Sequence, residues 1–351
     1  MHRALLYLLL SAILPLPLSA ELRLEKVSEL HTYEAFRGHL AQNDHLFIGK
    51  RMFGSTGHHL VLLDTETEKE VAQLDLPHSA RGIYAIGNDS VLVVGAIPNP
   101  WRTFATEIKV VGGKLELKKT HAIPEKFQID KFALVDGKWF FNERGDRAII
   151  SKWWRTYKKL KFEISGPDKM VGLNDELWAI ESRGMGHGDE SLLVYNTRSK
   201  THEKLILNSI GSRGISNILA LPEFNLIAID DSVGGRLIAL DAATRKVKLE
   251  LEIGTDIRGL ASYGRCIAAL RTNAKEIVWT KITDDQQLSE IARWDISGGG
   301  QNLDNPIDLT LASGKAFVRS LRPCPLCDPS VNYAGVFVAD DPESKIDENC
   351  L

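Results

Sequence analysis

The sequence predicts an all-β, seven-bladed β-propeller with four antiparallel strands per blade, and three observations carry this prediction. A glycine that begins an apolar run recurs at a fixed spacing: Gly38 and Gly82 are 44 residues apart, Gly214 and Gly259 are 45 apart, and Gly82 and Gly214 are separated by three such intervals. Each interval reads as short apolar runs separated by turn residues. Four-stranded units of this length are propeller blades, which cannot bury both faces alone.

Seven units follow the first 20 residues of the chain. They begin at Arg37-Gly38, Arg81-Gly82, Ile129, Pro167, Arg213-Gly214, Arg258-Gly259 and Asn305. In the second unit we expect strands over 82–86, 91–94, 106–110 and 115–120.

The last unit contains only three strands, the third over 335–339, whereas residues 22–30 read as a strand without a unit. We expect this N-terminal strand to complete the last blade and close the ring, which leaves no long open sheet edge.

The third strands of three units carry a short sequence signature. It reads LVLLDTET at 60–67, LLVYNTRS at 192–199 and LIALDAAT at 237–244. Together with the glycines that begin the units, this pattern resembles the bacterial YVTN, or surface-layer-type, seven-bladed propeller family, although no Tyr-Val-Thr-Asn occurs. The resemblance covers residues 21–351 and implies the fold. It implies no single activity, because the family includes proteins of very different roles.

The N-terminal segment predicts export. Arg3 precedes an apolar run over 5–14, prolines interrupt the run, and Leu18-Ser19-Ala20 ends in small residues, so residues 1–20 read as a signal peptide cleaved after Ala20. A membrane anchor is the alternative, but the apolar run is too short to span a bilayer. We therefore expect one propeller domain over 21–351 in the periplasm or outside the cell.

Arginines concentrate on one expected face of the propeller, where the loops between blades and the loops between second and third strands lie. This face would hold 13 of the 20 arginines, so recognition of an anion is one interpretation. The alternative is pairing of each arginine with a neighbouring acid. The candidate ligand-binding residues are Arg37, Arg81, Arg213 and Arg258 at the channel mouth, and Arg51, Arg144, Arg183, Arg271, Trp101 and Arg102 in the other loops.

Two of these loops look longer than a strand connection requires. They cover 95–106, with Trp101 beside Arg102, and 319–335. Long loops on a rigid scaffold often carry function. Trp101 either contacts a partner or folds back onto its own blade.

Four cysteines are present: Cys266, Cys324, Cys327 and Cys350. We expect a structural disulfide that joins Cys324 to Cys327, or one of them to Cys350. Cys266 reads as a buried, unpaired residue of a strand. Prolines at 323, 325 and 329 disfavour a thioredoxin-like helix after Cys324, and the other ligands of a zinc site are not evident. No metal and no cofactor are predicted.

The sequence leaves two functions open. The first is an exported binding protein whose arginine-rich face recognises an anionic small molecule or an acidic protein surface. The second is a propeller enzyme or enzyme subunit, similar to sugar-lactone hydrolases or to the large subunits of periplasmic amine dehydrogenases. His78 is the only histidine expected in a loop between blades. A net charge of −3 argues against a nucleic-acid partner that binds through bulk charge. The oligomeric state stays open.

Overall fold

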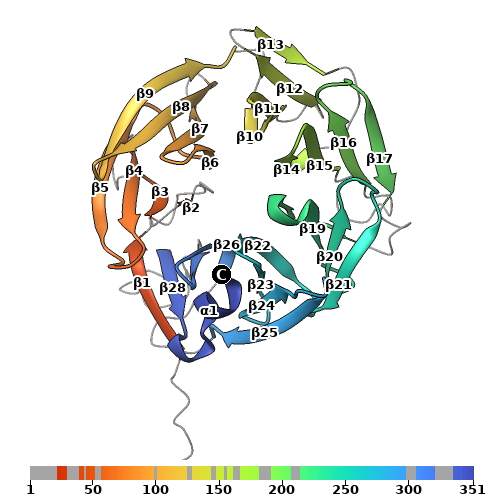
Figure 1. Cartoon of the computed structure of the whole chain (residues 1–351). Coiled ribbons are helices and arrows are strands. Elements are labelled where there is room, and N and C mark those ends of the chain that lie inside the picture. Colours follow the sequence, from red (N-terminus) through yellow and green to blue (C-terminus); the bar gives the residue numbers. More distant parts are fainter. Residues whose placement is uncertain are drawn as a thin grey trace, which may run out of the picture.

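A computed structural model of the chain shows seven blades arranged as a ring about a central axis (Figure 1). The structure describes residues 22–29, 39–42, 45–51, 57–98, 101–124, 129–143, 148–153, 156–160, 167–181, 191–206, 214–297, 306–320 and 335–351. These residues form seven four-stranded antiparallel sheets, which confirms the predicted fold class.

The strand labels follow the order of the chain, and the four strands of each blade are given from the innermost to the outermost. Blade 1 contains β2 (His39–Gln42), β3 (His45–Arg51), β4 (His58–Asp64) and β5 (Glu70–Leu76). Blade 2 contains β6 (Gly82–Gly87), β7 (Ser90–Pro98), β8 (Trp101–Val111) and β9 (Lys114–Ala122). Blade 3 contains β10 (Ile129–Val135), β11 (Lys138–Glu143), β12 (Ala148–Trp153) and β13 (Thr156–Lys159). Blade 4 contains β14 (Pro167–Leu173), β15 (Glu176–Glu181), β16 (Ser191–Asn196) and β17 (His202–Ile206).

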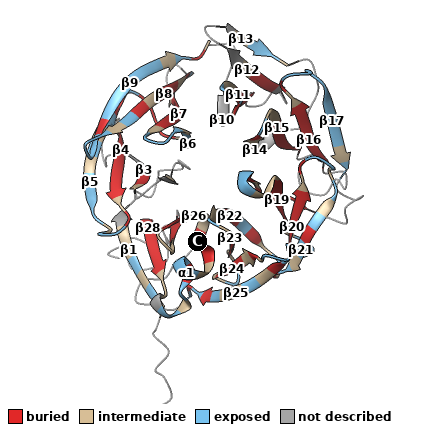
Figure 2. Cartoon of the chain, in the orientation of Figure 1, coloured by how far each residue is buried: buried red, intermediate tan, exposed pale blue. Residues whose placement is uncertain are grey.

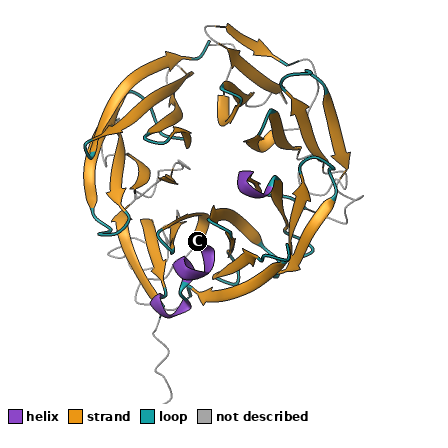
Figure 3. Ribbon diagram, viewed as in Figure 1, coloured by secondary structure: helices purple, strands orange, loops and turns teal. Residues whose placement is uncertain are grey.

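The remaining blades complete the ring. Blade 5 contains β18 (Ile218–Leu221), β19 (Leu226–Asp231), β20 (Arg236–Asp241) and β21 (Val247–Glu252). Blade 6 contains β22 (Ile257–Tyr263), β23 (Cys266–Arg271), β24 (Glu276–Ile282) and β25 (Leu288–Asp295). Blade 7 contains β26 (Pro306–Ala312), β27 (Lys315–Ser320), β28 (Gly335–Asp340) and, as its outer strand, β1 (Arg23–Glu29). The short helical segments are η2 (Pro222–Phe224), η3 (Pro342–Ser344) and α1 (Ile346–Cys350), drawn in purple in Figure 3.

Strand β1 closes the ring as the sequence predicts. It pairs antiparallel with β28, so the first and last strands of the described chain share one sheet. We call the edge of the ring with the connections between second and third strands, and between blades, the top face; the opposite edge is the bottom face. No helix in the described residues is long and apolar enough to cross a membrane.

The core lies between the blades. The buried apolar residues that the structure describes fall into seven clusters, and each cluster is shared by two neighbouring blades. We call each such contact a seam and name it by its two blades. The middle strands are therefore buried on both sides: β4 and β16 are almost continuously buried, whereas the outer strands β9 and β17 are mostly exposed (Figure 2). This explains why the middle strands read as apolar runs and not as alternating ones.

The sequence signature of the third strands is a turn. Asp64 Oδ1 accepts hydrogen bonds from the backbone N and the hydroxyl of Thr67, both at 2.7 Å, and Asp241 Oδ1 accepts from Thr244 N at 2.7 Å. These bonds hold the pKa of both carboxyls below their ordinary value. Each turn then places its next residue in the left-handed region, at φ 59° for Glu68 and 63° for Arg245. That residue points toward the preceding blade.

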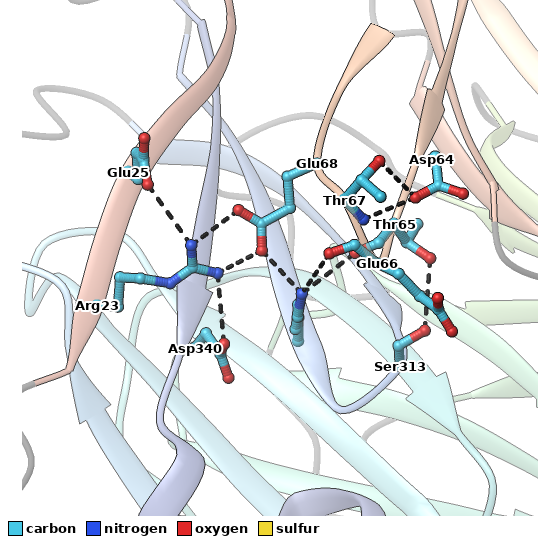
Figure 4. A network of polar contacts seen from close by, with 10 residues as sticks. Arg23, Glu25, Asp64, Thr65, Glu66, Thr67, Glu68, Ser313 and Asp340 are labelled. Atoms are coloured by element: carbon cyan, nitrogen blue, oxygen red, sulfur yellow. Dashed lines mark hydrogen bonds and ion pairs between the residues drawn. The ribbon is translucent and has the colours of Figure 1, made fainter. Parts of the chain in front are cut away.

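At the seam of blades 7 and 1, this turn residue locks the closed ring (Figure 4). The Glu68 carboxylate accepts from Arg23 Nη1 at 2.9 Å and from Lys315 Nζ at 2.8 Å, and Arg23 also reaches Asp340 Oδ2 at 3.3 Å. Burial alone would raise the pKa of Glu68, but the bonds from Arg23 and Lys315 outweigh it and hold the pKa below its ordinary value. The N-terminal strand is thereby tied to blade 1 as well as to blade 7.

At the seam of blades 4 and 5 the same position carries the opposite charge. Arg245 donates to Glu176 Oε1 at 2.5 Å and to Glu203 Oε1 at 2.6 Å. Its guanidinium lies 4.8 Å from the centre of the Trp178 ring, within the range of a cation–π contact. The two seams thus use one geometry with reversed polarity.

A disulfide fastens the seam of blades 6 and 7. Cys350, in α1, is bonded to Cys266, the first residue of β23, and both are fully buried. The expectation that Cys266 is unpaired is therefore wrong, and so is a pairing of Cys350 with Cys324 or Cys327, which lie outside the described residues. Blade 7 has no turn after β28, because its outer strand comes from the N-terminus. The C-terminal tail takes the place of that turn.

A second correction concerns blade 2. The segment 95–106, expected as a long loop, continues the β7–β8 ladder: Gly95 pairs with Phe104, Ala96 with Thr103 and Ile97 with Arg102. The extension is held because the Ser79 hydroxyl donates to Ala96 O at 2.9 Å. The ladder thus continues past the length of the other blades.

We expect the Cys266–Cys350 bond to contribute several kcal/mol to stability. It closes a chain separation of 84 residues, and removing a disulfide of this kind costs about 2–5 kcal/mol in the free energy of unfolding. Cys350→Ser and Cys266→Ser should each lower the urea midpoint by the same amount, and the double variant should be no less stable than either single one. Unequal single effects, or additive ones, would show that the two residues do not act as a pair.

Candidate functional site

The described part of the top face lies mainly on blades 5 and 6. Here the connection between blades, 253–256, passes between two strand connections, 232–235 and 272–275. Asp256 organises this region: its N donates to Ser232 O at 3.1 Å, its O accepts from Thr272 N at 3.2 Å, and its Oδ2 accepts from Asn273 N at 2.6 Å. The three connections therefore form one hydrogen-bonded platform.

Arg258 is the exposed cation of this platform. It lies at the channel end of β22, its side chain is 61% exposed, and its Nε lies 3.3 Å from Asp256 Oδ1. Among the described residues, the two Nη groups of Arg258 have no hydrogen-bond or ion-pair partner. A guanidinium held at one nitrogen, with its other two exposed, can form a two-point contact with a carboxylate or phosphate.

Arg271 is engaged within the structure. Its Nη1 contacts Glu276 Oε2 at 2.5 Å and its Nε donates to Thr255 O at 3.2 Å, and only 17% of its side chain is exposed. Its pairing follows from strand register, because Arg271 and Glu276 are direct partners of β23 and β24. Asp231 and Arg236 repeat this arrangement in blade 5, at 2.8 Å.

The other predicted site residues fall into two groups. Within the described chain, Arg51 ends β3, Trp101 begins β8, Arg102 is exposed on β8, and Arg81 is half-buried, with its backbone N donating to Val94 O. Arg37, Arg144, Arg183 and Arg213 lie outside the described residues, as do Cys324 and Cys327. Of the four predicted channel-mouth arginines, the structure therefore describes Arg81, which is half-buried, and Arg258, which is exposed and lies near Arg271 in blade 6.

A buried carboxylate supports the channel mouth beside this platform. Asp230 is fully buried; its Oδ1 accepts from Ser216 N at 2.9 Å and Asn217 N at 2.6 Å, and its Oδ2 accepts from the Ser216 hydroxyl at 2.6 Å. Burial raises the pKa of Asp230, and these bonds counteract the rise. The Ser216 hydroxyl also reaches Ile257 O at 3.0 Å, which links blade 5 to the strand that carries Arg258.

The sequence predicts that loop acids can pair with the arginines, as Asp231 does with Arg236, but sequence reasoning missed Asp256 and Glu276. Asp256 stands two residues before Arg258, so an acid close to a channel-mouth arginine was visible in the sequence. Its role was not, because Asp256 binds Asn273, which is 17 residues away. Glu276 could have been found by aligning the second and third strands of blade 6, since it is the direct partner of Arg271.

His78, the histidine considered for catalysis, is fully buried. Its Nδ1 donates to Ser79 O at 2.7 Å, so its neutral Nε2 accepts from the Thr106 hydroxyl at 2.6 Å. The ring also stacks on Phe104, with centres 5.6 Å apart. Burial lowers the pKa of His78 to about 4. Both ring nitrogens are used within the fold, so His78 anchors the extended hairpin of blade 2.

Several solved structures share the architecture of the chain. A streptogramin B lyase superposes with a TM-score of 0.62 at 11% identity, over 92% of this chain and 98% of that chain. A chain of a mitotic checkpoint complex gives 0.61 at 10% identity, over 91% and 96%. The β-propeller domain of Cps50 (Swd1) from Myceliophteria thermophila gives 0.58 at 11% identity, over 89% and 99%. At these identities the likeness shows the propeller fold alone. No family model and no curated protein matches the chain.

His78 should make the protein lose stability as the pH falls. Its pKa is near 6.5 when unfolded and about 4 when folded, so between these values the unfolded chain binds the extra proton and stability decreases with decreasing pH. From pH 7 to pH 4.5 the loss due to this group is about 2 kcal/mol.

Urea unfolding of the wild type and of His78→Gln at both pH values measures this term. The difference between the two proteins should shrink by about that amount at pH 4.5. A His78→Gln profile parallel to that of the wild type would contradict the assignment.

Proposed function

We propose that the protein is an exported binding protein whose top face recognises an anionic ligand or an acidic surface of a partner protein. The observation that carries the proposal is Arg258: a guanidinium at the channel mouth, mostly exposed and held at one nitrogen on a platform fixed by Asp256. A cation on a rigid support loses little conformational freedom on binding, which favours recognition. Neither a cofactor, nor a metal, nor a nucleic acid is part of this proposal.

Two arginines of the top face, Arg271 and Arg236, are paired with acids, which leaves fewer cations for a ligand to contact. Arg271 and Arg236 are satisfied by acids of their own blades, so they support the platform and leave Arg258 to contact the ligand. In the sequence, Arg37, Arg81 and Arg213 stand directly before a glycine as Arg258 does, but of these only Arg81 and Arg258 belong to the described residues.

Export belongs to the same proposal. Fully buried disulfides such as Cys266–Cys350 form and persist in oxidising compartments, which agrees with residues 1–20 as a signal peptide. The turn that follows the third strands accounts for the sequence signature through which the chain resembles the YVTN-type propellers. That resemblance supports the proposal that the protein is an exported propeller.

Arg198 provides a matched control for a test of Arg258. It is 71% exposed, its Nε lies 3.2 Å from Asp175 Oδ2, and it lies on the bottom face of blade 4. The two arginines therefore have similar exposure and the same kind of pairing, but on opposite faces.

We expect Arg258→Ala to weaken the binding of an acidic probe, because it removes a charge-assisted contact. The probe is a fluorescent decaglutamate peptide, measured by anisotropy at low ionic strength, where exposed charges are least screened. Its affinity should fall about five- to tenfold, whereas Arg198→Ala should change it by less than about twofold. Equal losses in the two variants, or no binding by the wild type, would overturn the proposal.

A further inference from the structure

A pocket opens on the bottom face at the seam of blades 5 and 6. Its volume is about 270 Å³, so it is smaller than a typical small-molecule site and of the size of one large side chain. Its apolar lining comes from Phe224, Leu226, Leu249 and Ile282, and Lys248 and Gln286 stand beside them. The pocket lies on the face opposite Arg258, so it is independent of the proposed top-face function.

The pocket occupies a position that the chain fills at other seams. At three other seams, the first residue of a blade's second strand is bound by a residue that comes later around the ring. Lys315 of blade 7 is bound by Glu68 in the turn after the third strand of blade 1, and Glu176 of blade 4 by Arg245 in the same turn of blade 5. Cys266 of blade 6 is bound by Cys350 in the C-terminal tail. At the seam of blades 5 and 6, the first residue of the second strand is Leu226, and the corresponding turn residue of blade 6 is Gln286.

The geometry of the turn supports this equivalence. Gln286 has φ 57°, like the residues that bind across the other seams, and Thr283 N donates to Gln287 O at 2.9 Å as Asp241 N does to Lys246 O. The turn is one residue shorter, and its left-handed residue is uncharged. It therefore cannot form the ion pair found at the seams of blades 4 and 5 and of blades 7 and 1.

Blade 5 also lacks the tryptophan that blade 4 carries in its second strand, although Phe224 packs against the buried cluster of this seam. In blade 4 the third residue of the second strand is Trp178, which lies under the guanidinium of Arg245. In blade 5 that position is Ala228, and its direct partner on β20 is Ala239. Both alanines belong to the buried cluster that includes Leu226 and Leu249 of the pocket. The position that holds a tryptophan ring against a guanidinium in blade 4 therefore holds an alanine in blade 5.

From these comparisons we infer that the pocket receives a single aromatic side chain of a partner protein. An inserted ring would lie on Leu226, Leu249 and Ile282, beside the cation of Lys248, which is exposed on β21. A ring would then lie beside a cation, as it does at the neighbouring seam, although here the cation comes from the preceding blade. Aromatic side chains that enter small pockets are also the residues that dominate the affinity of protein interfaces.

The probe for this inference is N-acetyl-L-tryptophanamide, added to the full-length protein with 13C-labelled leucine and isoleucine methyl groups. Saturable shifts are expected at Leu226, Leu249 and Ile282, with a Kd on the order of 1 mM because the probe is a fragment. N-acetyl-L-leucinamide should bind at least about fivefold more weakly, since it lacks the ring. No shift at these methyls, or equal binding of the two probes, would overturn the inference.

A pair of neighbouring glutamines provides the variant and its control. Gln286 lines the pocket, whereas the adjacent Gln287 is exposed and does not. Gln286→Trp should place a ring over the opening and weaken binding of the probe by about tenfold or more, and Gln287→Trp should leave it within about twofold. Unchanged binding to a folded Gln286→Trp protein would contradict the assigned position.

Lys248 gives a second test that perturbs the fold less; the other cation of the pocket lining, Arg265, is paired with Asp284. Lys248→Ala removes the exposed ammonium beside the pocket, and Lys246→Ala removes another exposed lysine near the start of the same strand. Only the first should weaken the tryptophanamide complex, by about two- to fivefold. Equal affinities of both variants and the wild type would exclude the cation–π contact.

Discussion

The closure of the ring is the constraint on which the rest of this structure depends. Each blade buries both faces of its middle strands against its neighbours, and the apolar clusters of the described chain all lie between blades. An open ring would expose two such faces at once. The contacts that join blade 7 to blades 1 and 6 therefore stabilise the whole ring and not only their own seams, because the other seams depend on the ring being closed.

The fold closes the ring with both ends of the chain. The N-terminal strand β1 pairs with β28, and the C-terminal helix α1 is bonded to blade 6 through Cys350. Between these ends, Glu68 draws β1 toward blade 1. The reversed polarity of the Glu68 and Arg245 contacts has a further consequence. If the turn that carries Arg245 lay at the seam of blades 7 and 1, its guanidinium would face the cations Arg23 and Lys315. Each turn therefore fits only its own seam, and an alternative order of blades is disfavoured.

The fold could be predicted from the sequence because its signals are local and repeated. The spacing of Gly38, Gly82, Gly214 and Gly259, and a last unit without its fourth strand, were sufficient to predict seven blades closed by residues 22–30. Residues 95–106 were expected to form a loop because they look too long for a strand connection, whereas the pairs from Gly95–Phe104 to Pro98–Trp101 show that the β7–β8 ladder continues.

Side-chain partners were harder to predict than strands. Cys266 and Cys350 are 84 residues apart, and their bond exists because the tail folds back across two blades. The roles of the arginines depend on register: Arg271 faces an acid across its own hairpin, whereas Arg258 faces the channel mouth. Composition alone treats the two residues alike, so the candidate site could be located by face but not resolved into supporting and exposed cations.

A double-mutant cycle between Glu68 and Lys315 tests ring closure most directly. The two groups are 2.8 Å apart and mostly buried, with 11% and 17% of their side chains exposed. Glu68→Gln and Lys315→Met, alone and together, should give a coupling of about 1–3 kcal/mol in the free energy of unfolding. The exposed Lys118–Glu116 pair, with 45% and 47% of its side chains exposed, should give no measurable coupling. A Glu68–Lys315 coupling as small as that of the exposed pair would contradict the central role assigned to this seam.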